Sequence, residues 1–409
     1  MSDHATKLLV FDDASETLGP MTRRLAAFEL LTGGVTSLAR IERRLGRPAD
    51  ALRAPGGLAA TTGRRHTTPV NAPLDAGPWR VVSGRWHAQT AVERVLDLRV
   101  GEALVERDGA VVAAVVPAEL AEAIARGEPL PDAVSTQTLQ EPALYARPWD
   151  VVRFLPRTLP SDLDTFEYPQ LPSGHVAGLS VVGEHAARAH PSARVVPPVT
   201  FDATLGPIVI DQRVEIRPFV SIQGPVYVGP DTVVQPFTSL RPHTALGPHC
   251  RVGGEISHSL VQGYSNKAHG GYLGNACVGQ WCNLGADTTV SNLKNTYGAI
   301  RTRLEPDADA IDTGLTHQGP VIADMVRTAI GTLVPTGGCL DFASSIARAA
   351  GFAPKYAAPF SWVTDAGCET YDLTKLIQTL RLSMARRGVE LDDDEAAVVR
   401  ALHERYASK

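Results

Sequence analysis

The sequence lacks the features that would place the protein in a membrane, on nucleic acid or outside the cell. No apolar run approaches the ~20 residues of a membrane-spanning helix. The formal net charge of −5 gives no electrostatic basis for binding nucleic acid or an anionic membrane. The five cysteines include no Cys-x-x-Cys pair, and the apolar run after Asp3 and His4 is too short for a signal peptide. We therefore expect a reduced, cytoplasmic protein with neither nucleic-acid nor membrane partners.

Aromatic residues are scarce at 6%, whereas 44% hydrophobic and 20% charged residues are typical of a soluble globular protein. A chain of 409 residues exceeds one ordinary core and indicates two or three domains.

An aliphatic residue returns at every sixth position between Ile210 and Val252. The series is Ile210, Ile216, Ile222, Val228, Val234, Leu240, Leu246 and Val252. A period of six fits neither a strand nor a helix, but it fits a coil of three short faces with one inward aliphatic residue per face. The pattern predicts a left-handed parallel β-helix built of hexapeptide repeats.

The repeat then changes phase, and we expect its continuation at Leu260, Tyr272, Val278, Leu284 and Val290, with polar Asn266 in an aliphatic place. It resumes at Ile322, Val334, Leu340 and Ile346. The polar stretch of residues 295–319 between these parts is expected to be a loop that protrudes from the coil.

Strand and helix patterns alternate before the coil, which favours an α/β domain over residues 1–155. Residues 7–11 and 79–82 are expected strands, residues 103–116 a hairpin, residues 23–29, 38–45, 119–126 and 147–154 helical segments, and residues 49–78 a loop. The proline-rich residues 156–174 are an expected linker. The coil would cover residues 175–350, and residues 351–409 a helical tail in which Asp372 and Asp392 cap two helices.

The segment from Gly263 to Gly274 departs most from the repeat and brings Lys267, His269 and Tyr272 close together. Equivalent positions of successive turns stack, so Asn283 is expected near His269. A histidine within a repeat is more often structural, but here a lysine and two glycines flank it. This favours a functional histidine.

The block GYSNKAHGGYLGNACVGQWCNLGADTTVSNLKN resembles the acetyltransferase half of the bifunctional glucosamine-1-phosphate acetyltransferase / N-acetylglucosamine-1-phosphate uridyltransferase family (GlmU). It is most similar to a divergent branch labelled sugar nucleotidyltransferase. The resemblance is specific over residues 205–295 and faint in the N-terminal domain. It implies transfer of acetyl from acetyl-CoA to an amino-sugar phosphate or a nucleotide-linked amino sugar, as in UDP-GlcNAc biosynthesis. It also implies a homotrimer.

The resemblance assigns roles to individual residues. The catalytic set it implies is His269 as general base, Asn283, the backbone amide of Ala286 as donor to the thioester oxyanion, and Glu255 as support of the base. The substrate-binding set is Arg241, Lys267, Tyr272, Asn292 and Lys294. The paired lysines that the family carries one turn earlier are absent. No metal is expected in this site.

The chemistry of the set is coherent, since attack of an amine on a thioester needs a base near neutral pKa and a fixed donor to the developing oxyanion. The N-terminal domain lacks the glycine-rich loop with arginine that typical sugar-nucleotide pyrophosphorylases carry after the first strand. Asp12 and Asp13 follow this strand, either as Mg²⁺ ligands or as a strand-end turn.

Two other classes compete with the acyltransferase. One is a zinc hydratase on the same coil, which needs closely spaced histidines; His243, His249, His258 and His269 form no His-x4-His pair. The other is a non-catalytic hexapeptide scaffold or sugar-nucleotide sensor.

Overall fold

The computed structural model describes residues 6–13, 16–349 and 351–407, and the chain divides into two compact units. Unit 1 comprises Met1–Leu18, Arg24–Leu31 and Val35–Arg147. Unit 2 comprises Gly19–Arg23, Thr32–Gly34 and Pro148–Lys409.

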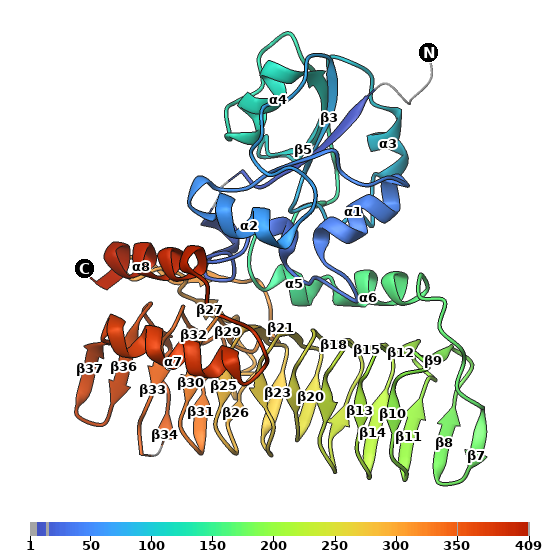
Figure 1. The fold of residues 1–409 in the computed structure, drawn as a ribbon, viewed down its shortest axis with the longest axis vertical. Coiled ribbons are helices and arrows are strands. Elements are labelled where there is room, and N and C mark those ends of the chain that lie inside the picture. Colours follow the sequence, from blue (N-terminus) through green and yellow to red (C-terminus); the bar gives the residue numbers. More distant parts are fainter. Residues whose placement is uncertain (1–5, 14–15, 350, 408–409) are drawn as a thin grey trace. The chain divides into compact units, whose positions relative to one another are not determined.

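Unit 1 is an α/β domain around a six-stranded mixed sheet of order β2-β1-β3-β5-β4-β6 (Figure 1). Its strands are β1 (Lys7–Phe11), β2 (Ala51–Arg53), β3 (Pro78–Ser83), β4 (Glu102–Val105), β5 (Val111–Pro117) and β6 (Ser135–Thr138), and its helices are α1 (Ser37–Leu45), α2 (Ala59–Arg65), α3 (Val92–Asp97) and α4 (Ala118–Ala125), with 3-10 turns η2 (Glu16–Leu18), η3 (Ala27–Glu29) and η4 (Gly56–Leu58). Because strand side chains alternate, Leu8 and Val10 enter one core cluster while Leu9 and Phe11 enter another on the opposite side of the sheet. Strand β1 is therefore buried on both faces.

Most of the elements expected in unit 1 are present. The strand over residues 7–11, the strand expected over residues 79–82, and the hairpin around Gly109 are confirmed. Two expectations are wrong: residues 49–78 contain β2 and α2, and residues 23–29 form only the short turn η3. Helix α2 includes Thr61, Thr62 and Gly63, which have weak intrinsic helix propensity, so local sequence does not reveal it.

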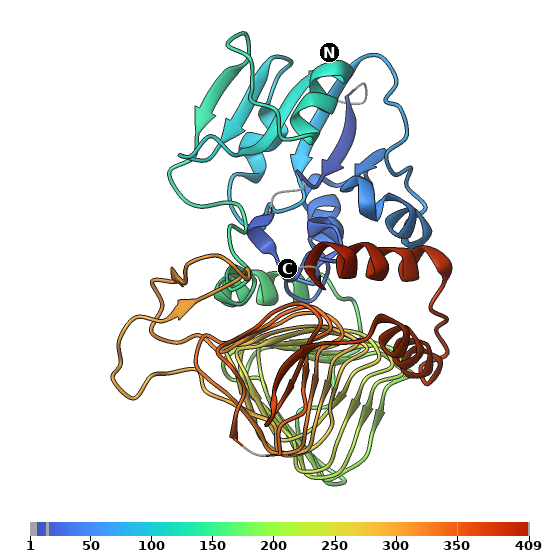
Figure 2. The same ribbon diagram turned by 90° about the vertical axis from the view of Figure 1, so that its left-hand side faces the viewer.

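Unit 2 is built on a parallel β-helix with three faces, seen end-on in Figure 2. Face 1 is the sheet β10 (Arg194–Val195), β13 (Glu215–Ile216), β16 (Val233–Val234), β19 (Arg251–Val252), β22 (Asn266–Lys267), β25 (Asn283–Leu284), β30 (Arg327–Thr328), β33 (Ser345–Ile346), β36 (Ser361–Thr364) and β37 (Gly367–Thr370). Face 2 contains β7 (Gly174–Val176), β8 (Leu179–Val182), β11 (Val199–Asp202), β14 (Val220–Gln223), β17 (Ser239–Leu240), β20 (Glu255–Ser257) and β23 (Tyr272–Gly274), followed by the separate sheet β26 (Thr289–Val290), β31 (Thr332–Val334) and β34 (Gly351–Phe352). Face 3 contains β9 (Ala187–Ala189), β12 (Ile208–Ile210), β15 (Val226–Val228), β18 (Thr244–Leu246), β21 (Leu260–Gly263), β24 (Cys277–Gln280), β29 (Val321–Ile322), β32 (Cys339–Leu340) and β35 (Tyr356–Ala357).

The coil confirms the fold class that the six-residue period predicts. All eight aliphatic residues of the first series are buried in one continuous core cluster. In-register pairing stacks them between turns, so that Ile216 lies over Val234 and Val234 over Val252. Each turn buries its aliphatic residues only against its neighbours, as a solenoid requires.

The position of the polar interruption differs from the expectation. Strand β22 pairs Asn266 with Arg251 and Lys267 with Val252. Lys267, not Asn266, therefore takes the inward place of an aliphatic residue, and Leu273 rather than Tyr272 follows in the core. The prediction missed this by one residue because the rung between Val252 and Lys267 is shorter than the rungs before it.

The protruding segment between β26 and β29 is present, and its two strands β27 (Arg301–Thr302) and β28 (Ile311–Asp312) pair antiparallel. The coil continues past Ala347, where the sequence pattern fades, through β35 and β36. The proline-rich segment before the coil begins with helix α6 (Leu155–Leu163), which follows α5 (Asp150–Arg153).

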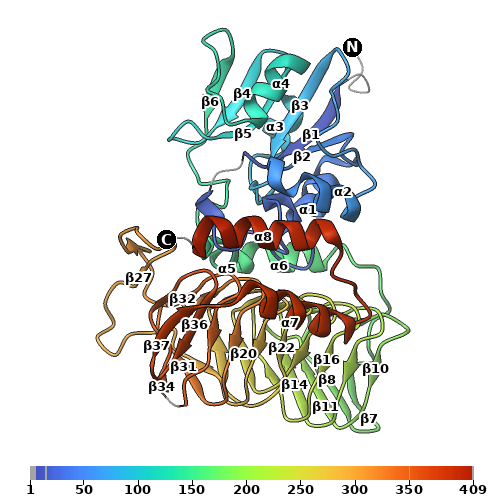
Figure 3. The ribbon, with the colours of Figure 1, turned by 60° about the vertical axis from the view of Figure 1, so that its left-hand side comes forward.

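Two C-terminal helices pack on the coil within unit 2 (Figure 3). Helix α7 (Leu373–Ala385) begins where Asp372 accepts a hydrogen bond from the Lys375 amide at 2.8 Å, and it buries Leu376, Ile377, Leu380 and Met384. Helix α8 (Asp393–Ala407) begins where Asp392 accepts from the Glu395 amide at 2.8 Å. Both predicted caps are confirmed. Among the described residues, no helix combines the length and the apolar character needed to cross a bilayer.

Candidate functional site

A groove on face 1 of the coil contains three of the predicted catalytic residues. This groove, called the His269 groove here, has a volume of about 430 Å³. Its lining residues are Gln235, Arg251, Asn266, Ala268, His269, Asn283, Leu284, Gly285, Ala286, Ile330, Arg386 and Arg387. Residues from turns far apart in sequence and from the end of helix α7 thus meet at one surface.

His269 lies at the corner between face 1 and face 2, directly after β22, and its side chain is exposed. Its main-chain carbonyl accepts a hydrogen bond from the Lys267 ammonium at 2.9 Å, which fixes the corner. Its ring nitrogens have no hydrogen-bond partner among the described residues. An imidazole held in this way is available to a ligand in the groove.

Asn283 lies one turn beyond Asn266 in the same outward column of face 1. The register pairs Arg251 with Asn266, Asn266 with Asn283, and Asn283 with Arg327. The amide of Asn266 donates to Oδ1 of Asn283 at 3.2 Å. Adjacent strands lie about 4.8 Å apart, so this column presents two amides between two arginines along the groove.

The backbone around Ala286 provides an available donor. The carbonyl of Ala286 accepts a hydrogen bond from the Gly331 amide at 2.7 Å. The amide N–H of Ala286 donates to no other group within the described part of the chain. Because Ala286 lines the groove with His269, this N–H can bind an oxygen of a ligand there.

A second group of predicted site residues lies on face 2 and does not line the His269 groove. Glu255 and Tyr272 are register partners on β20 and β23, and Arg241 forms an ion pair with Glu255 at 3.1 Å. Asn292 donates from Nδ2 to the Tyr272 hydroxyl at 3.1 Å and to Oδ1 of Asn275 at 2.6 Å. Burial and the neighbouring Glu255 raise the pKa of Tyr272. Glu255 is thus engaged by Arg241 rather than by His269.

The two predicted lysines bind protein groups. The Lys267 ammonium is buried and donates to the carbonyls of Gly253, His269 and Gly270 at 2.8–2.9 Å. Burial lowers the pKa of Lys267 to about 8, and nearby Asp287 opposes this effect. Lys294 donates to the carbonyl of Ala299 in the protruding segment. The Lys267 ammonium therefore binds backbone carbonyls at the corner of the coil and does not face the groove as a phosphate ligand.

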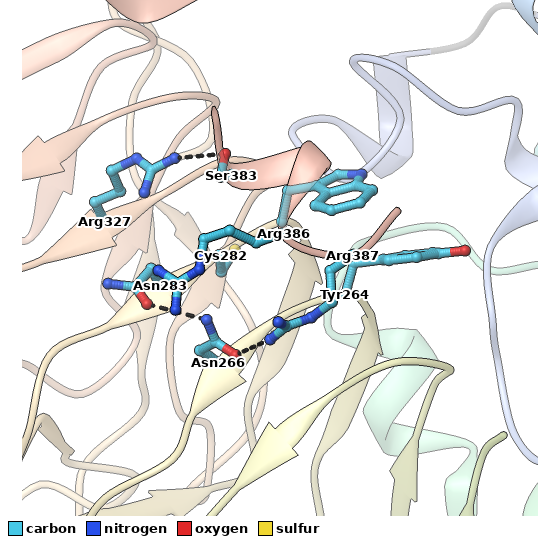
Figure 4. A pocket seen from close by; sticks show the side chains of 9 residues that line it. Tyr264, Asn266, Cys282, Asn283, Arg327, Ser383, Arg386 and Arg387 are labelled. Atoms are coloured by element: carbon cyan, nitrogen blue, oxygen red, sulfur yellow. Dashed lines mark hydrogen bonds between the residues drawn. The ribbon is translucent and has the colours of Figure 1, made fainter. Parts of the chain in front are cut away.

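The groove also contains arginines that the sequence analysis did not select. A smaller cavity of about 100 Å³ shares Asn266, Asn283, Arg386 and Arg387 with the groove (Figure 4). Arg327, from β30, lines this cavity as well. The sequence does contain the Arg386-Arg387 pair, which could have suggested an anion site. Its place beside face 1 depends on the packing of α7 against the coil.

The carboxylates at the end of β1 in unit 1 are engaged by protein groups. Asp12 accepts a hydrogen bond from the Ala27 amide at 2.6 Å, and Asp13 forms an ion pair with Arg85 at 2.6 Å. The described residues contain no group of three or more His, Cys, Asp or Glu side chains arranged to hold a metal ion. These two carboxylates therefore do not fit a Mg²⁺ site in this arrangement. Of the four histidines considered for a zinc hydratase, His243 and His258 lie with their ring centroids 5.1 Å apart, and among the described residues no third ligand joins them in a metal-binding group.

Residues 8–168 match the family model described as "Sugar nucleotidyl transferase". This range covers the sheet of unit 1 and extends through α6. The match supports a transferase with a sugar nucleotidyltransferase-like N-terminal domain. No curated protein matches the chain.

Among solved structures, the chain is similar to a Bacillus cereus protein named as a candidate acetyltransferase. The two are 11% identical, and the alignment covers 56% of this chain and 91% of that chain with a TM-score of 0.19.

Proposed function

We propose that the protein is a sugar N-acyltransferase whose reaction takes place in the His269 groove. The donor is acetyl-CoA, and the acceptor is the amine of an amino-sugar phosphate or of a nucleotide-linked amino sugar. The observation that carries the proposal is the shared position of an unengaged imidazole, the Asn283 amide and the free Ala286 N–H in one groove.

In the proposed reaction, the neutral amine attacks the thioester carbon while His269 removes a proton from the nitrogen. A C–N bond forms and the carbonyl π electrons move to oxygen, where the Ala286 N–H donates to the negative charge. The tetrahedral intermediate then collapses with cleavage of the C–S bond. The thiolate leaves and takes the proton from the imidazolium, so the products are an N-acetyl sugar and free coenzyme A.

The face 2 residues fit a role at the acceptor. Tyr272 follows His269 by three residues, and its hydroxyl is fixed by Asn292. Arg241 and Glu255 are both half-exposed and lie in adjacent rungs of the same face. We propose that this face forms part of the acceptor site in a homotrimer, in which a second copy covers the corner. Light scattering of purified protein tests the assembly, and a monomer with full activity would contradict it.

The test of the function is a thiol-release assay with acetyl-CoA against a panel of amino-sugar phosphates and nucleotide-linked amino sugars. The expected result is stoichiometric formation of coenzyme A and an acetylated sugar, identified by mass spectrometry. Thiol release with no member of the panel would contradict the proposal and favour a non-catalytic scaffold or sugar-nucleotide sensor.

The family match favours a second activity in unit 1, transfer of a nucleotidyl group to a sugar 1-phosphate. In that reaction the sugar phosphate oxygen attacks the α-phosphorus of a nucleoside triphosphate and pyrophosphate leaves. An assay for pyrophosphate release with added Mg²⁺ tests it. Activity unaffected by Arg85→Gln, which removes the ion pair of Asp13, would argue against an active centre at the end of β1.

A further inference from the structure

Four arginines line the His269 groove and the adjoining small cavity: Arg251 lines the groove, Arg327 lines the small cavity, and Arg386 and Arg387 line both. Arg251 and Arg327 come from the coil, where Arg251 pairs with Asn266 and Arg327 pairs with Asn283 in the same column. Arg386 and Arg387 come from the end of α7. Figure 4 shows the guanidinium groups of Arg327 and Arg387 on either side of the two asparagines. This set is called the arginine cluster below.

The arginine cluster has only neutral partners. Arg387 donates to Oδ1 of Asn266 at 2.7 Å, and Arg327 donates to Oγ of Ser383 at 3.2 Å. Arg251 donates to the carbonyls of Asp231 and Cys250 at 2.8 and 2.9 Å. None of the four forms an ion pair with a carboxylate in the described part of the chain, and the buried Nε atoms of Arg327 and Arg387 have no hydrogen-bond partner at all.

Several other arginines of unit 2 form ion pairs with carboxylates. Arg23 binds Asp341 at 2.9 Å and Glu305 at 2.7 Å, and Arg213 binds Asp231 at 2.7 Å. Asp231 also lies 3.6 Å from His249. The hydrogen bond from Arg213 contributes most to lowering the pKa of Asp231, and the nearby charge of Arg251 lowers it further, although Arg251 and Asp231 form no ion pair. What sets the cluster apart is that four guanidinium groups without an ion pair among the described residues gather around one groove and its adjoining cavity, where a ligand can supply the counter-charge.

Electrostatics of the cluster agree with this reading. Burial, followed by the charges of Arg251 and Arg386, lowers the pKa of Arg387. The C-terminal end of α7 attracts positive charge to Arg386 and Arg387. The helix dipole does not account for Arg251 and Arg327, which come from the coil. Guanidinium groups grouped without carboxylates are suited to bidentate binding of phosphate oxygens.

We propose that the arginine cluster binds the phosphate groups of a phosphorylated ligand whose reactive part extends along the groove to His269. The proposal rests on the proposed acyltransferase and names the chemistry by which its substrate is held. It also assigns to Arg251, Arg327, Arg386 and Arg387 the phosphate contacts that the buried Lys267 does not make. The phosphate belongs either to coenzyme A or to the sugar phosphate or sugar nucleotide acceptor.

The test measures binding by isothermal titration of full-length protein with three probes: coenzyme A, a uridine-diphosphate amino sugar and inorganic phosphate. The variant is Arg387→Gln, and Arg387→Lys keeps the charge but loses the fork geometry. Arg381→Gln is the matched control, because Arg381 is an exposed arginine of the same helix that lines neither cavity. Melting temperatures of all variants establish that they fold.

The expected result is at least about tenfold weaker binding of one organic probe by Arg387→Gln, partial recovery in Arg387→Lys, and no change in Arg381→Gln. The probe that is weakened identifies the source of the phosphate. Equal affinity of wild type and Arg387→Gln for all three probes, or an equal loss in Arg381→Gln, would overturn the proposal.

The two proposals fail in different ways. Arginine-dependent binding without any acetyl transfer would contradict the acyltransferase proposal and support the phosphate site. If acetyl transfer occurs and Arg387→Gln leaves KM for both substrates unchanged, the phosphate site is contradicted and the acyltransferase proposal is supported.

Discussion

Two parts of the same coil use equivalent positions differently. In the rungs from Ile208 to Leu246, the inward positions are aliphatic, and outward Glu215 on face 1 is paired with Arg217 at 3.1 Å. In the rungs from Arg251 to Val290, an inward position holds Lys267 and the outward column holds two asparagines between arginines without carboxylate partners. The side chains of the first part stabilise the coil by apolar packing. The second part has less apolar packing, and its polar and charged side chains line a groove.

The largest effect on stability is expected when a lysine, like Lys267, is placed at an inward position of the regular rungs. Val234 is fully buried and pairs with Ile216 and Val252. We expect Val234→Lys to lower the free energy of unfolding by about 3–5 kcal/mol, since it buries a charge without a built partner. Urea unfolding measures the change, with Val234→Met as the control for added length. A loss no greater than that of Val234→Met would show that any rung accepts a lysine.

Because Lys267 is buried, we expect it to make the free energy of unfolding depend on pH. Its pKa is lowered to about 8 in the folded chain, whereas an unfolded lysine titrates near ~10.4. Between these values the unfolded chain binds more protons, so the free energy of unfolding rises with pH from about 8 to ~10.4, and this gain is absent below pH 8. The rise is on the order of 2–3 kcal/mol.

The measurement is the difference between unfolding curves of wild type and Lys267→Met at successive pH values, which cancels the titration of other lysines. Parallel curves for the two proteins between pH 8 and 10 would contradict the assignment of the slope to Lys267.

The smallest effect concerns the helix that brings Arg386 and Arg387 to the groove. Asp372 caps α7 through the Lys375 amide, and we expect Asp372→Ala to cost about 1 kcal/mol. Asp372→Asn keeps an accepting oxygen and should cost a few tenths of this. Thermal unfolding compares the two variants. Equal melting temperatures of Asp372→Ala and Asp372→Asn would show that the capping hydrogen bond does not stabilise α7.

The sequence predicts the coil well because its information is local and repeated. Each rung contributes an aliphatic residue at a fixed spacing, so Ile216, Val234 and Val252 define the core without reference to the rest of the fold. The prediction failed where a rung became shorter, and it placed Asn266 in the core instead of Lys267. Spacing alone does not reveal which of two adjacent residues turns inward after such a change.

The candidate site was predictable only in part for a related reason. His269, Asn283 and Ala286 come from successive turns, so stacking brings them together as expected. The arginine cluster depends on α7 folding back onto face 1, and no spacing within the sequence reports that contact. The roles of Glu255 and Lys267 were expected from resemblance, whereas their contacts with Arg241 and with corner carbonyls depend on the actual register.

The most direct measurement is the rate of acetyl transfer in a single turnover, with wild type and His269→Gln at saturating substrates. His269 is exposed, so the substitution should leave stability unchanged. The matched control is His185→Gln, because His185 is an exposed histidine in the bend between β8 and β9, near the start of the coil. We predict that His269→Gln slows transfer by about 10²–10⁴-fold while His185→Gln has no effect. Transfer at the wild-type rate in His269→Gln would contradict the assignment of the irregular rungs as the catalytic part of the coil.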